Sequence, residues 1–428
     1  MKDIIGIIQA NRKGALQGVY AICCAQPLVI EAAIKQAKYD QAPILIEATA
    51  NQVNQFGGYT GMQPKDFIKF IGDIADKYDY PKEHIILGGD HLGPVCWVNE
   101  NSSDAMAKAK DLIASYVAAG FKKIHLDTSM GCVDDPEILP DEVVAKRAAD
   151  LCLVAEQTAI AHFGHSGLVY VVGTEVPPPG GATEEIAELE LTPVNRVEQT
   201  INLHQEAFEL LGLTDAWQRV IGLVVQPGVE FDHTSIIDYQ SNKAQALSHC
   251  IKNIPNIAFE AHSTDYQNPQ AYKELVKDHF AILKVGPQLT YAMREALYAL
   301  SYIEDILISS EKTSHLRDIC EQEMLESPNY WQKFYQVPPS KGLLYRSYSY
   351  SDRIRYYWNN SRVDSAVTKL LDNLNDLAIP LPLISQFLPE QYQAIRQNKL
   401  NNQAKDLVID KIMQVTGIYA DACYKQSK

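Results

Sequence analysis

An aspartate and a histidine stand side by side in the stretch LGGDHLGP, residues 87–94, at the end of a short apolar run. A tight turn explains glycine and aspartate at such a place, but it does not require an imidazole. An imidazole can hold a divalent cation that polarises a carbonyl group, while a neighbouring carboxylate moves a proton. The pair therefore predicts metal-assisted catalysis, with His91 as a ligand and Asp90 as the acid or base.

A second histidine, His262 in EAHSTDYQ, ends another apolar run, and we expect it to bind the same metal. Two acids compete for the place of a third ligand, namely Glu175 in GTEVPPPGG and Glu156 in LCLVAEQ, and Glu175 is also a candidate catalytic acid. Zinc accepts mixed histidine and carboxylate ligands, so we expect a divalent metal, zinc first and manganese or magnesium as alternatives.

Polar residues that end the other apolar runs are candidates for proton transfer or substrate binding. Asp127 in HLDTSM is expected to transfer the proton in place of Asp90, to bond substrate hydroxyls or to orient a ligand. Substrate contacts are expected from Glu47, Gln226, Glu230 and His233, and His233 is also an alternative metal ligand.

A phosphate site is predicted where the run ILKVGPQLT passes into a helix, because barrel proteins often bind phosphate there through backbone amides. Gly286 would offer such an amide and Lys284 a positive charge. Ser263 and Asp265, which follow His262, are expected to complete this site for a small anionic substrate.

Eight short, apolar, β-branched runs carry these residues, and helical patterns separate them. The runs cover residues 19–26, 43–49, 84–91, 122–128, 169–175, 219–228, 256–262 and 281–286. Strands and helices that alternate eight times predict an α/β fold, the (β/α)8 or TIM barrel. Barrel enzymes place their sites at the carboxyl ends of the strands, so we expect the polar residues at one mouth.

The pattern changes to helices after about residue 290, and aromatic-rich stretches follow, such as NYWQKFYQVPPS. This tail is too long to be only the last helix of a barrel. We predict a barrel over residues 1–310 and a mainly helical C-terminal extension over residues 311–428, packed on the barrel or forming a partner surface.

The composition argues against several classes of protein. The formal charge of −15, from 53 acidic and 38 basic residues, disfavours binding to nucleic acid. The N-terminus has no signal-peptide core, and no run approaches the roughly 18 apolar residues of a membrane span. The eight cysteines lack metal-type spacing, which indicates reduced thiols. We expect a cytoplasmic protein with no nucleic-acid or membrane partner.

The motif string resembles the GatZ/KbaZ family, the Z subunits of class II D-tagatose-1,6-bisphosphate aldolase. The motifs are IEATANQVNQFGGYTGM, ILGGDHLGP, IHLDTSM, GTEVPPPGG, VVQPGVEFDH, FEAHSTDYQ, HFAILKVGP and SDRIRYYW, spread over nearly the whole chain. The resemblance implies a (β/α)8 barrel that acts in tagatose-type sugar phosphate metabolism. Some family members are described as non-catalytic subunits, some carry kinase labels, and relatives act as D-tagatose-6-phosphate 4-epimerases.

The resemblance also implies distant kinship with catalytic class II aldolases, in which an aspartate precedes a zinc-binding histidine on strand three. Asp90 and His91 match that pair, and His262 matches a second zinc histidine after strand seven. A further ligand histidine on the helix after strand four is replaced here by Glu156. This replacement argues against ordinary zinc aldolase activity but leaves room for a metal.

Two functions remain open on the sequence. The first is a C4 epimerase that interconverts D-tagatose 6-phosphate and D-fructose 6-phosphate, or the free ketohexoses, by a retro-aldol route. The alternative is a non-catalytic subunit that stabilises and activates a separate class II aldolase chain. A protein that only binds sugar phosphate is a third class, and a kinase ranks last because no nucleotide phosphate loop is present. Either main function is compatible with a homo-oligomer.

Overall fold

The computed structural model describes residues 3–174, 189–375 and 377–424 of the chain. Glu175, a candidate metal ligand and catalytic acid, lies outside the described residues.

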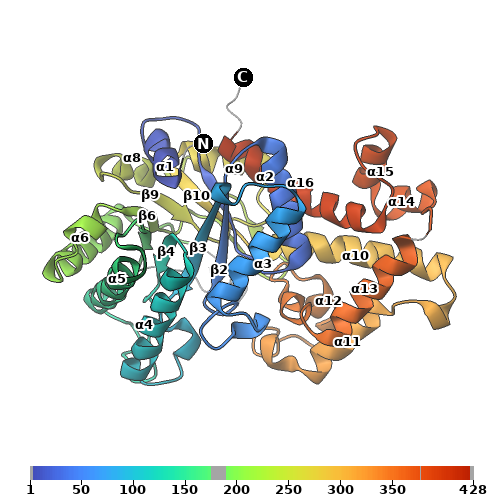
Figure 1. The fold of residues 1–428 in the computed structure, drawn as a ribbon, viewed down its shortest axis with the longest axis horizontal. Coiled ribbons are helices and arrows are strands. Elements are labelled where there is room, and N and C mark those ends of the chain that lie inside the picture. The colour runs from blue at the N-terminus through green and yellow to red at the C-terminus, as the bar shows by residue number, and fades with distance from the viewer. Residues whose placement is uncertain (1–2, 175–188, 376, 425–428) are drawn as a thin grey trace.

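Eight parallel strands close into a barrel, in the spatial order β1-β10-β9-β6-β5-β4-β3-β2 (Figure 1). They are β1 (Val19–Ile22), β2 (Ile44–Thr49), β3 (Ile85–Leu92), β4 (Lys123–Leu126), β5 (Val169–Val172), β6 (Val220–Val224), β9 (Ala258–Ala261) and β10 (Phe280–Val285). The predicted (β/α)8 fold is confirmed. Most predicted runs extend beyond the strands because their last polar residues already belong to loops at the mouth.

Helices cover the outside of the barrel between successive strands (Figure 1). They are α2 (Pro27–Asp40), α3 (Pro64–Lys77), α4 (Ser102–Ala119), α5 (Asp141–Phe163), α6 (Val194–Leu210) and α9 (Pro269–Lys277). Local signals start several of them: Pro27 and Pro269 stand in first turns, and the Asn268 side chain accepts hydrogen bonds from the first amides of α9.

Shorter elements lie in the connections between the strands and the covering helices. They are η1 (Gly58–Thr60), η2 (Lys82–His84), η3 (Pro94–Trp97), α7 (Thr214–Trp217), the hairpin of β7 (Glu230–Phe231) and β8 (Ile236–Ile237), α8 (Gln245–Cys250) and η4 (Ile251–Asn253). The first helix, α1 (Ile4–Arg12), packs Ile4 and Ile8 into the apolar cluster inside the barrel. This helix therefore closes the end of the barrel opposite the mouth.

The chain leaves the barrel along α10 (Pro287–Leu307) and forms a helical extension beside it (Figure 1). The extension contains η5 (Ser310–Lys312), α11 (Leu316–Glu326), η6 (Pro328–Tyr330), α12 (Pro339–Tyr348), η7 (Arg353–Tyr357), α13 (Ser361–Asn375), α14 (Leu381–Phe387) and α15 (Pro389–Arg396). The helical C-terminal part agrees with the sequence prediction. None of the described helices has both the length and the apolar character that crossing a membrane requires.

The last helix, α16 (Ala404–Tyr424), returns to the barrel and packs against α2, α9 and α10. The amide of Gly18, just before β1, donates to the carbonyl of Cys423 over 3.0 Å. The buried ring of Tyr419 lies between Tyr20 and Tyr272, with centroid distances of 5.8 and 4.2 Å. The wall beside β1 is thus completed by the chain's last helix, because α10, which follows β10, is directed into the extension.

Candidate active site

Strand β3 brings two successive polar side chains to one pocket. Neighbours in a regular strand point to opposite faces, yet Asp90 and His91 both line the pocket. His91 has a left-handed backbone with φ of 50°, and the register between β3 and β4 shifts at this point, so the alternation is broken. A Cβ atom on Gly88 would lie 2.5 Å from Oε1 of Glu47, so glycine leaves the space that this carboxylate occupies.

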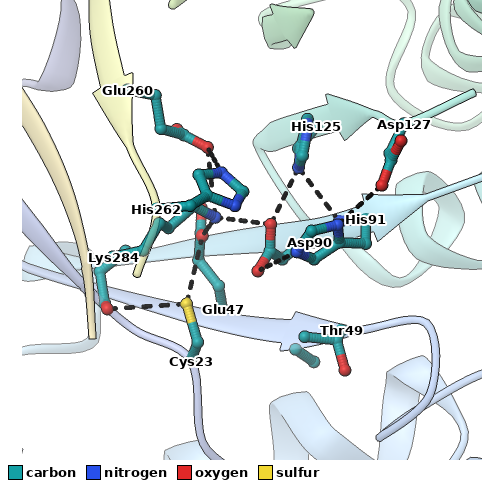
Figure 2. A network of polar contacts seen from close by, with 12 residues as sticks. Cys23, Glu47, Thr49, Asp90, His91, His125, Asp127, Glu260, His262 and Lys284 are labelled. Atoms are coloured by element: carbon teal, nitrogen blue, oxygen red, sulfur yellow. Dashed lines mark hydrogen bonds and ion pairs between the residues drawn. The ribbon is translucent and has the colours of Figure 1, made fainter. Parts of the chain in front are cut away.

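Three imidazoles from three strands gather at the carboxyl ends of β3, β4 and β9 (Figure 2). The ring centroids of His91 and His125 are 5.2 Å apart, those of His91 and His262 5.1 Å, and those of His125 and His262 5.3 Å. All three side chains are buried. Three rings at such spacing can direct nitrogen atoms at one small ligand or ion.

A carboxylate orients each ring. Nδ1 of His91 lies 2.7 Å from Oδ2 of Asp127, Nδ1 of His125 lies 2.9 Å from Oδ1 of Asp90, and Nε2 of His262 lies 3.0 Å from Oε1 of Glu260. A carboxylate that accepts the Nδ1 proton leaves the lone pair on Nε2, which is the form of histidine that binds metals. The described geometry thus prepares His91 as a nitrogen ligand, whereas Nδ1 of His125 also accepts from the amide of His91 over 3.2 Å, so the tautomer of His125 decides which of its nitrogens carries the proton.

Two buried lysines hold the carboxylates beneath and beside the rings. Nζ of Lys123, inside the barrel, lies 2.7 Å from Oε1 of Glu47 and 2.7 Å from Oε2 of Glu260. Nζ of Lys284 lies 2.6 Å from Oδ1 of Asp90, 3.4 Å from Oε1 of Glu260, and also contacts Oε2 of Glu47. Every carboxylate in this group except Asp127 therefore has an ammonium neighbour.

The cluster carries excess negative charge even so. The carboxylates are Glu47, Asp90, Asp127 and Glu260, and the ammonium groups that face them are those of Lys123 and Lys284, so two negative charges remain that only the neighbouring imidazoles could compensate. Buried charge of one sign is costly unless it is paired. A divalent cation would neutralise the excess.

The protonation equilibria reflect the same arrangement. Burial opposes ionisation of Asp90, but the neighbouring His91 and Lys284 hold the pKa of its carboxyl well below the usual range. Burial lowers the pKa of His262 to about 4, so its imidazole is neutral at pH 7. Burial also opposes the charged form of His91, but Asp90 and Asp127 outweigh it and raise the pKa of this imidazole.

One group of donor atoms meets the requirements of a metal site. Ligand atoms of Asp90, His125, Glu260 and His262 lie within 4.8 Å of one another, and all four residues are buried. Nε2 of His125 is buried and has no hydrogen-bond partner among the described residues. Buried polar atoms are normally bonded, so this nitrogen points to a missing ligand. The residues fit a divalent cation bound by nitrogen and oxygen.

A second group of donors, Cys23, Glu47 and Asp90, is equally close in space but contains no imidazole. The ammonium group of Lys284 contacts Glu47 and Asp90 of this group and also Asp90 and Glu260 of the first, so its charge does not distinguish the two groups. Imidazole nitrogen suits zinc and related divalent metals, so the first group has the more suitable donors.

The cluster opens into a pocket that holds about 920 Å³ of space, part of it at the open mouth. Its walls are formed by the end of β3, by segments after β1, β2, β6, β9 and β10, and by η7 with the residues that follow it. The predicted site residues that line it are Asp90, His91, His262, Ser263, Asp265, Lys284 and Gly286. Glu47 and Asp127 are buried behind this layer, where Glu47 pairs with the lysines and Asp127 with His91. The structure thus brings most of the predicted residues together.

Glu156 does not reach the cluster, which corrects the expectation that it supplies a ligand. It lies on α5, where its carboxylate pairs with Arg219 at 2.6 Å and accepts hydrogen bonds from Ser166 and Tyr170. Arg219 precedes β6 and Ser166 precedes β5, so the pair sits at the end of the barrel opposite the mouth. Glu156 therefore connects α5 to β5 and to the residue that precedes β6.

Three more predicted substrate ligands have structural partners. Gln226 accepts hydrogen bonds from the amides of Gly228 and Val229, and Glu230 accepts one from the amide that follows it. The ring of His233 contacts Ser351 and the carbonyl of Phe334, both in the C-terminal extension. None of the three predicted ligands is among the described residues that line the pocket. His233 instead anchors the extension to the loop after β6.

The predicted phosphate cradle at the start of α10 is occupied by a side chain of the protein. Oδ1 of Asp265 accepts hydrogen bonds from the amides of Gly286 and Gln288, over 3.0 and 2.8 Å. Burial raises the pKa of Asp265 to about 6. These amides are therefore not available to a substrate anion in this structure.

Sequence reasoning missed four residues of the site: Lys123, His125, Arg355 and Tyr356. The first two alternate with Asp127 along β4, and this period of two in KKIHLDT was a signal that all three face the barrel interior. Arg355 and Tyr356 belong to η7 and line the pocket across its mouth. They belong to the stretch SDRIRYYW, in which no local pattern indicates a contact with the barrel.

The whole described architecture corresponds to one protein family. The family model for D-tagatose-1,6-bisphosphate aldolase subunit GatZ/KbaZ-like proteins matches residues 4–424 of the chain. The chain belongs to the GatZ/KbaZ-like family. Because the match includes α11 to α16, the extension is part of the family's common structure and not an appendage of this chain alone.

The chain is also similar to several solved structures. A crystal structure of a probable tagatose 6 phosphate kinase from Sinorhizobium meliloti is 46% identical, has a TM-score of 0.88, and is matched over 95% of this chain and 100% of its own. The YdjI aldolase from Escherichia coli is 13% identical with a TM-score of 0.42, over 71% of this chain and 87% of its own. A fructose-bisphosphate aldolase from Campylobacter jejuni is 14% identical with a TM-score of 0.42, over 87% of this chain and 94% of its own.

Proposed function

We propose that this GatZ/KbaZ-like protein is a metal-dependent C4 epimerase that interconverts D-tagatose 6-phosphate and D-fructose 6-phosphate, or the free ketohexoses. The observation that carries the proposal is the juxtaposition of Asp90 with three imidazoles at a pocket that Asp90, His91 and His262 line and that residues of the same chain cover. Epimerisation by a retro-aldol route uses an acid or base, donor atoms for a metal, and side chains that cover the substrate.

Inversion at C4 of a 2-ketose cannot proceed by simple deprotonation, because the hydrogen on C4 is not adjacent to the carbonyl at C2. One route oxidises C4 transiently and requires a nicotinamide cofactor, for which the chain has no dinucleotide motif. The other route breaks and remakes the bond between C3 and C4. That route requires only a base at the C4 hydroxyl and stabilisation of negative charge on the C1–C3 fragment.

In the second route Asp90 removes the proton of the C4 hydroxyl, which becomes the aldehyde of a three-carbon fragment. The electron pair of the C3–C4 bond passes to the other fragment as an enediolate. Rotation of the aldehyde presents its opposite face, the C3–C4 bond forms again, and Asp90 returns the proton. The carboxylate suits this role by its position, because it lines the pocket while its Oδ1 is held by Lys284 and His125.

Asp127 is better placed to position a ligand than to transfer the proton. Its carboxylate accepts hydrogen bonds from the ring of His91 and from the hydroxyl of Ser129, at 2.7 Å each. We expect His125, His262 and Glu260, whose ligand atoms lie within 4.8 Å of one another, to hold the cation together with His91, whose ring centroid lies 5.1 Å from that of His262. A divalent cation held there would polarise the C2 carbonyl and stabilise the enediolate charge.

The test is to incubate the purified chain with D-tagatose 6-phosphate and follow D-fructose 6-phosphate by NMR in D2O. We expect conversion without deuterium at C3 or C4, since neither hydrogen leaves its carbon in the retro-aldol route. Chelation should abolish conversion, and Asp90→Asn should slow it by about 10²- to 10⁴-fold. His125→Ala should lower the bound metal as measured by elemental analysis.

A matched control is Asp104→Asn, which removes the charge of an exposed aspartate on α4 and should leave the rate unchanged. Absence of conversion with zinc, manganese and magnesium in turn, together with activation of a catalytic aldolase chain on mixing, would replace the epimerase by the accessory subunit. Deuterium at C4 would exclude the retro-aldol route.

A further inference from the structure

The C-terminal extension sends one segment, residues 349–359, back over the mouth of the barrel. Arg355, Tyr356 and Asn359 of this segment line the same pocket as Asp90 and His91. The pocket is therefore built by two distant parts of the chain, and nothing in the barrel alone supplies these three side chains.

Contacts with several barrel loops fix the segment in place. The amide of Tyr350 donates to the carbonyl of His233 over 2.9 Å, and the hydroxyl of Tyr266 donates to the carbonyl of Tyr350 over 2.7 Å. The rings of Tyr59 and Tyr356 meet edge to face with centroids 4.9 Å apart. A side chain held between the loops after β2, β6 and β9 has a defined position and is suited to recognition.

The two permanently cationic side chains among the described residues of the pocket differ in their partners. Lys284, at the bottom, contacts the carboxylates of Glu47, Asp90 and Glu260. The guanidinium of Arg355 is hydrogen-bonded to oxygens without formal charge, namely the carbonyls of Ser351 and Asp352 and the hydroxyl of Tyr356. The charge of Lys284 is thus compensated inside the protein, whereas Arg355 retains donors for an external anion.

The acids near Arg355 are themselves engaged. Oδ1 of Asp265 accepts from the amides of Gly286 and Gln288, and Oδ2 of Asp352 accepts from the hydroxyl of Thr290 over 2.6 Å. Neither forms a hydrogen-bonded ion pair with Arg355 within the part of the chain that the structure describes. Burial disfavours the charge of Arg355, but Tyr356, Tyr59 and Asp352 outweigh it and raise the pKa of the guanidinium.

We infer that Arg355 binds the phosphate group of the substrate and selects a phosphorylated ketose over the free sugar. This inference rests on the proposed function and names the substrate class of the same site. It also replaces the phosphate cradle expected at Gly286, because Asp265 fills that cradle. A ketose phosphate would lie with its carbonyl end toward the imidazoles and its phosphate toward η7, so the two ends of the pocket match the two ends of the substrate.

Binding is the direct test, because it does not depend on turnover. Affinities for D-tagatose 6-phosphate and for D-tagatose are measured by calorimetry on the full chain as wild type, Arg355→Gln and Arg355→Lys. We expect Arg355→Gln to weaken binding of the phosphate ester about 30-fold and binding of the free sugar less than about twofold, since a hydrogen bond to a charged group is lost. Arg355→Lys keeps the charge and should restore part of the difference.

Arg362→Gln is the matched control, because it removes an arginine of the same extension that pairs with Glu323 and Glu326 and does not line the pocket. Equal weakening of both sugars by Arg355→Gln, or no phosphate preference in the wild type, would overturn the inference. Phosphate-dependent binding through Arg355 without conversion to D-fructose 6-phosphate would support the inference and remove the epimerase. Conversion by Arg355→Gln with an unchanged KM for the phosphate ester would support the epimerase and overturn the inference about Arg355.

Discussion

Replacement of Lys123 by methionine tests how the interior of the barrel is held together. Methionine keeps the length of the side chain but removes the ammonium group. The carboxylates of Glu47 and Glu260 would then lose their common partner at 2.7 Å while remaining fully buried. We expect the folded state to be strongly destabilised, with the helices and strands otherwise unchanged.

The magnitude follows from the geometry of these ion pairs. At 2.7 Å and an effective dielectric constant of about 20, each pair contributes about 6 kcal/mol of attraction. Much of this offsets the removal of three charges from water, so the net loss is smaller. Removal of one partner of a buried pair costs about 3–5 kcal/mol. Since one ammonium serves two carboxylates, we expect the upper end, about 5 kcal/mol, or more than a thousandfold in the folding equilibrium.

The assay is urea unfolding followed by far-UV circular dichroism, with Lys122→Met as the control. Lys122 is the preceding residue, but its side chain is exposed, so its loss should change the free energy of unfolding by less than about 0.5 kcal/mol. A Lys123→Met variant that is no less stable than Lys122→Met would refute the reasoning, because it would mean that Glu47 and Glu260 need no buried counter-charge.

The pH dependence of the same variant gives a second check. Burial opposes the charge of Glu260, but Lys123 and Lys284 hold its pKa well below the usual range. A depressed carboxyl pKa stabilises the folded state above the unfolded pKa of about 4.3, and this contribution is lost as the pH falls. The difference between wild type and Lys123→Met should therefore be largest near pH 7 and should shrink below about pH 4.3.

Two further perturbations test the C-terminal part of the chain. Burial raises the pKa of Asp352 to about 6, so the folded state loses stability as the pH rises and this carboxyl ionises. In urea titrations Asp352→Asn should therefore be about 3 kcal/mol more stable than wild type at pH 8 and equal to it near pH 4. Asparagine also tolerates the left-handed backbone there, and an unchanged pH profile would contradict the assignment. Tyr419→Ala should cost about 3–5 kcal/mol and Tyr419→Phe about 1 kcal/mol, both in a single unfolding transition, because α16 belongs to the barrel wall. A separate early transition of the extension in thermal unfolding would show that α16 is not part of that wall.

The alternation of apolar runs and helical patterns determined the barrel, because parallel strands covered on both faces are predominantly apolar. It also determined which end holds the site. Asp90, His91, His262 and Lys284 stand at the carboxyl ends of their strands, and the closed order of the sheet places those ends at one mouth. The sequence alone was sufficient for this, since strand direction is uniform in a parallel barrel.

Closure of the barrel decided which residues meet across it. Lys123 and His125 lie in an otherwise apolar strand, and their roles appear only when β2 and β9 bring Glu47 and Glu260 to Lys123 and β3 brings Asp90 to His125. The backbone of His91 also breaks the two-residue alternation, so its side chain and that of Asp90 share the pocket. Both effects depend on register and on one dihedral angle, neither of which is set by local sequence.

The extension was the part least accessible to sequence. Helical periodicity predicted its helices, but contacts between residues hundreds of positions apart place Arg355 over the mouth and α16 in the wall. Glu156 is a residue that the fold keeps away from the mouth. The sequence predicts it as a metal ligand, but α5 places its carboxylate beside Arg219 at the opposite end of the barrel. Residue type and order indicate what chemistry is available, whereas packing decides which end of a helix, and which partner, a charged side chain reaches.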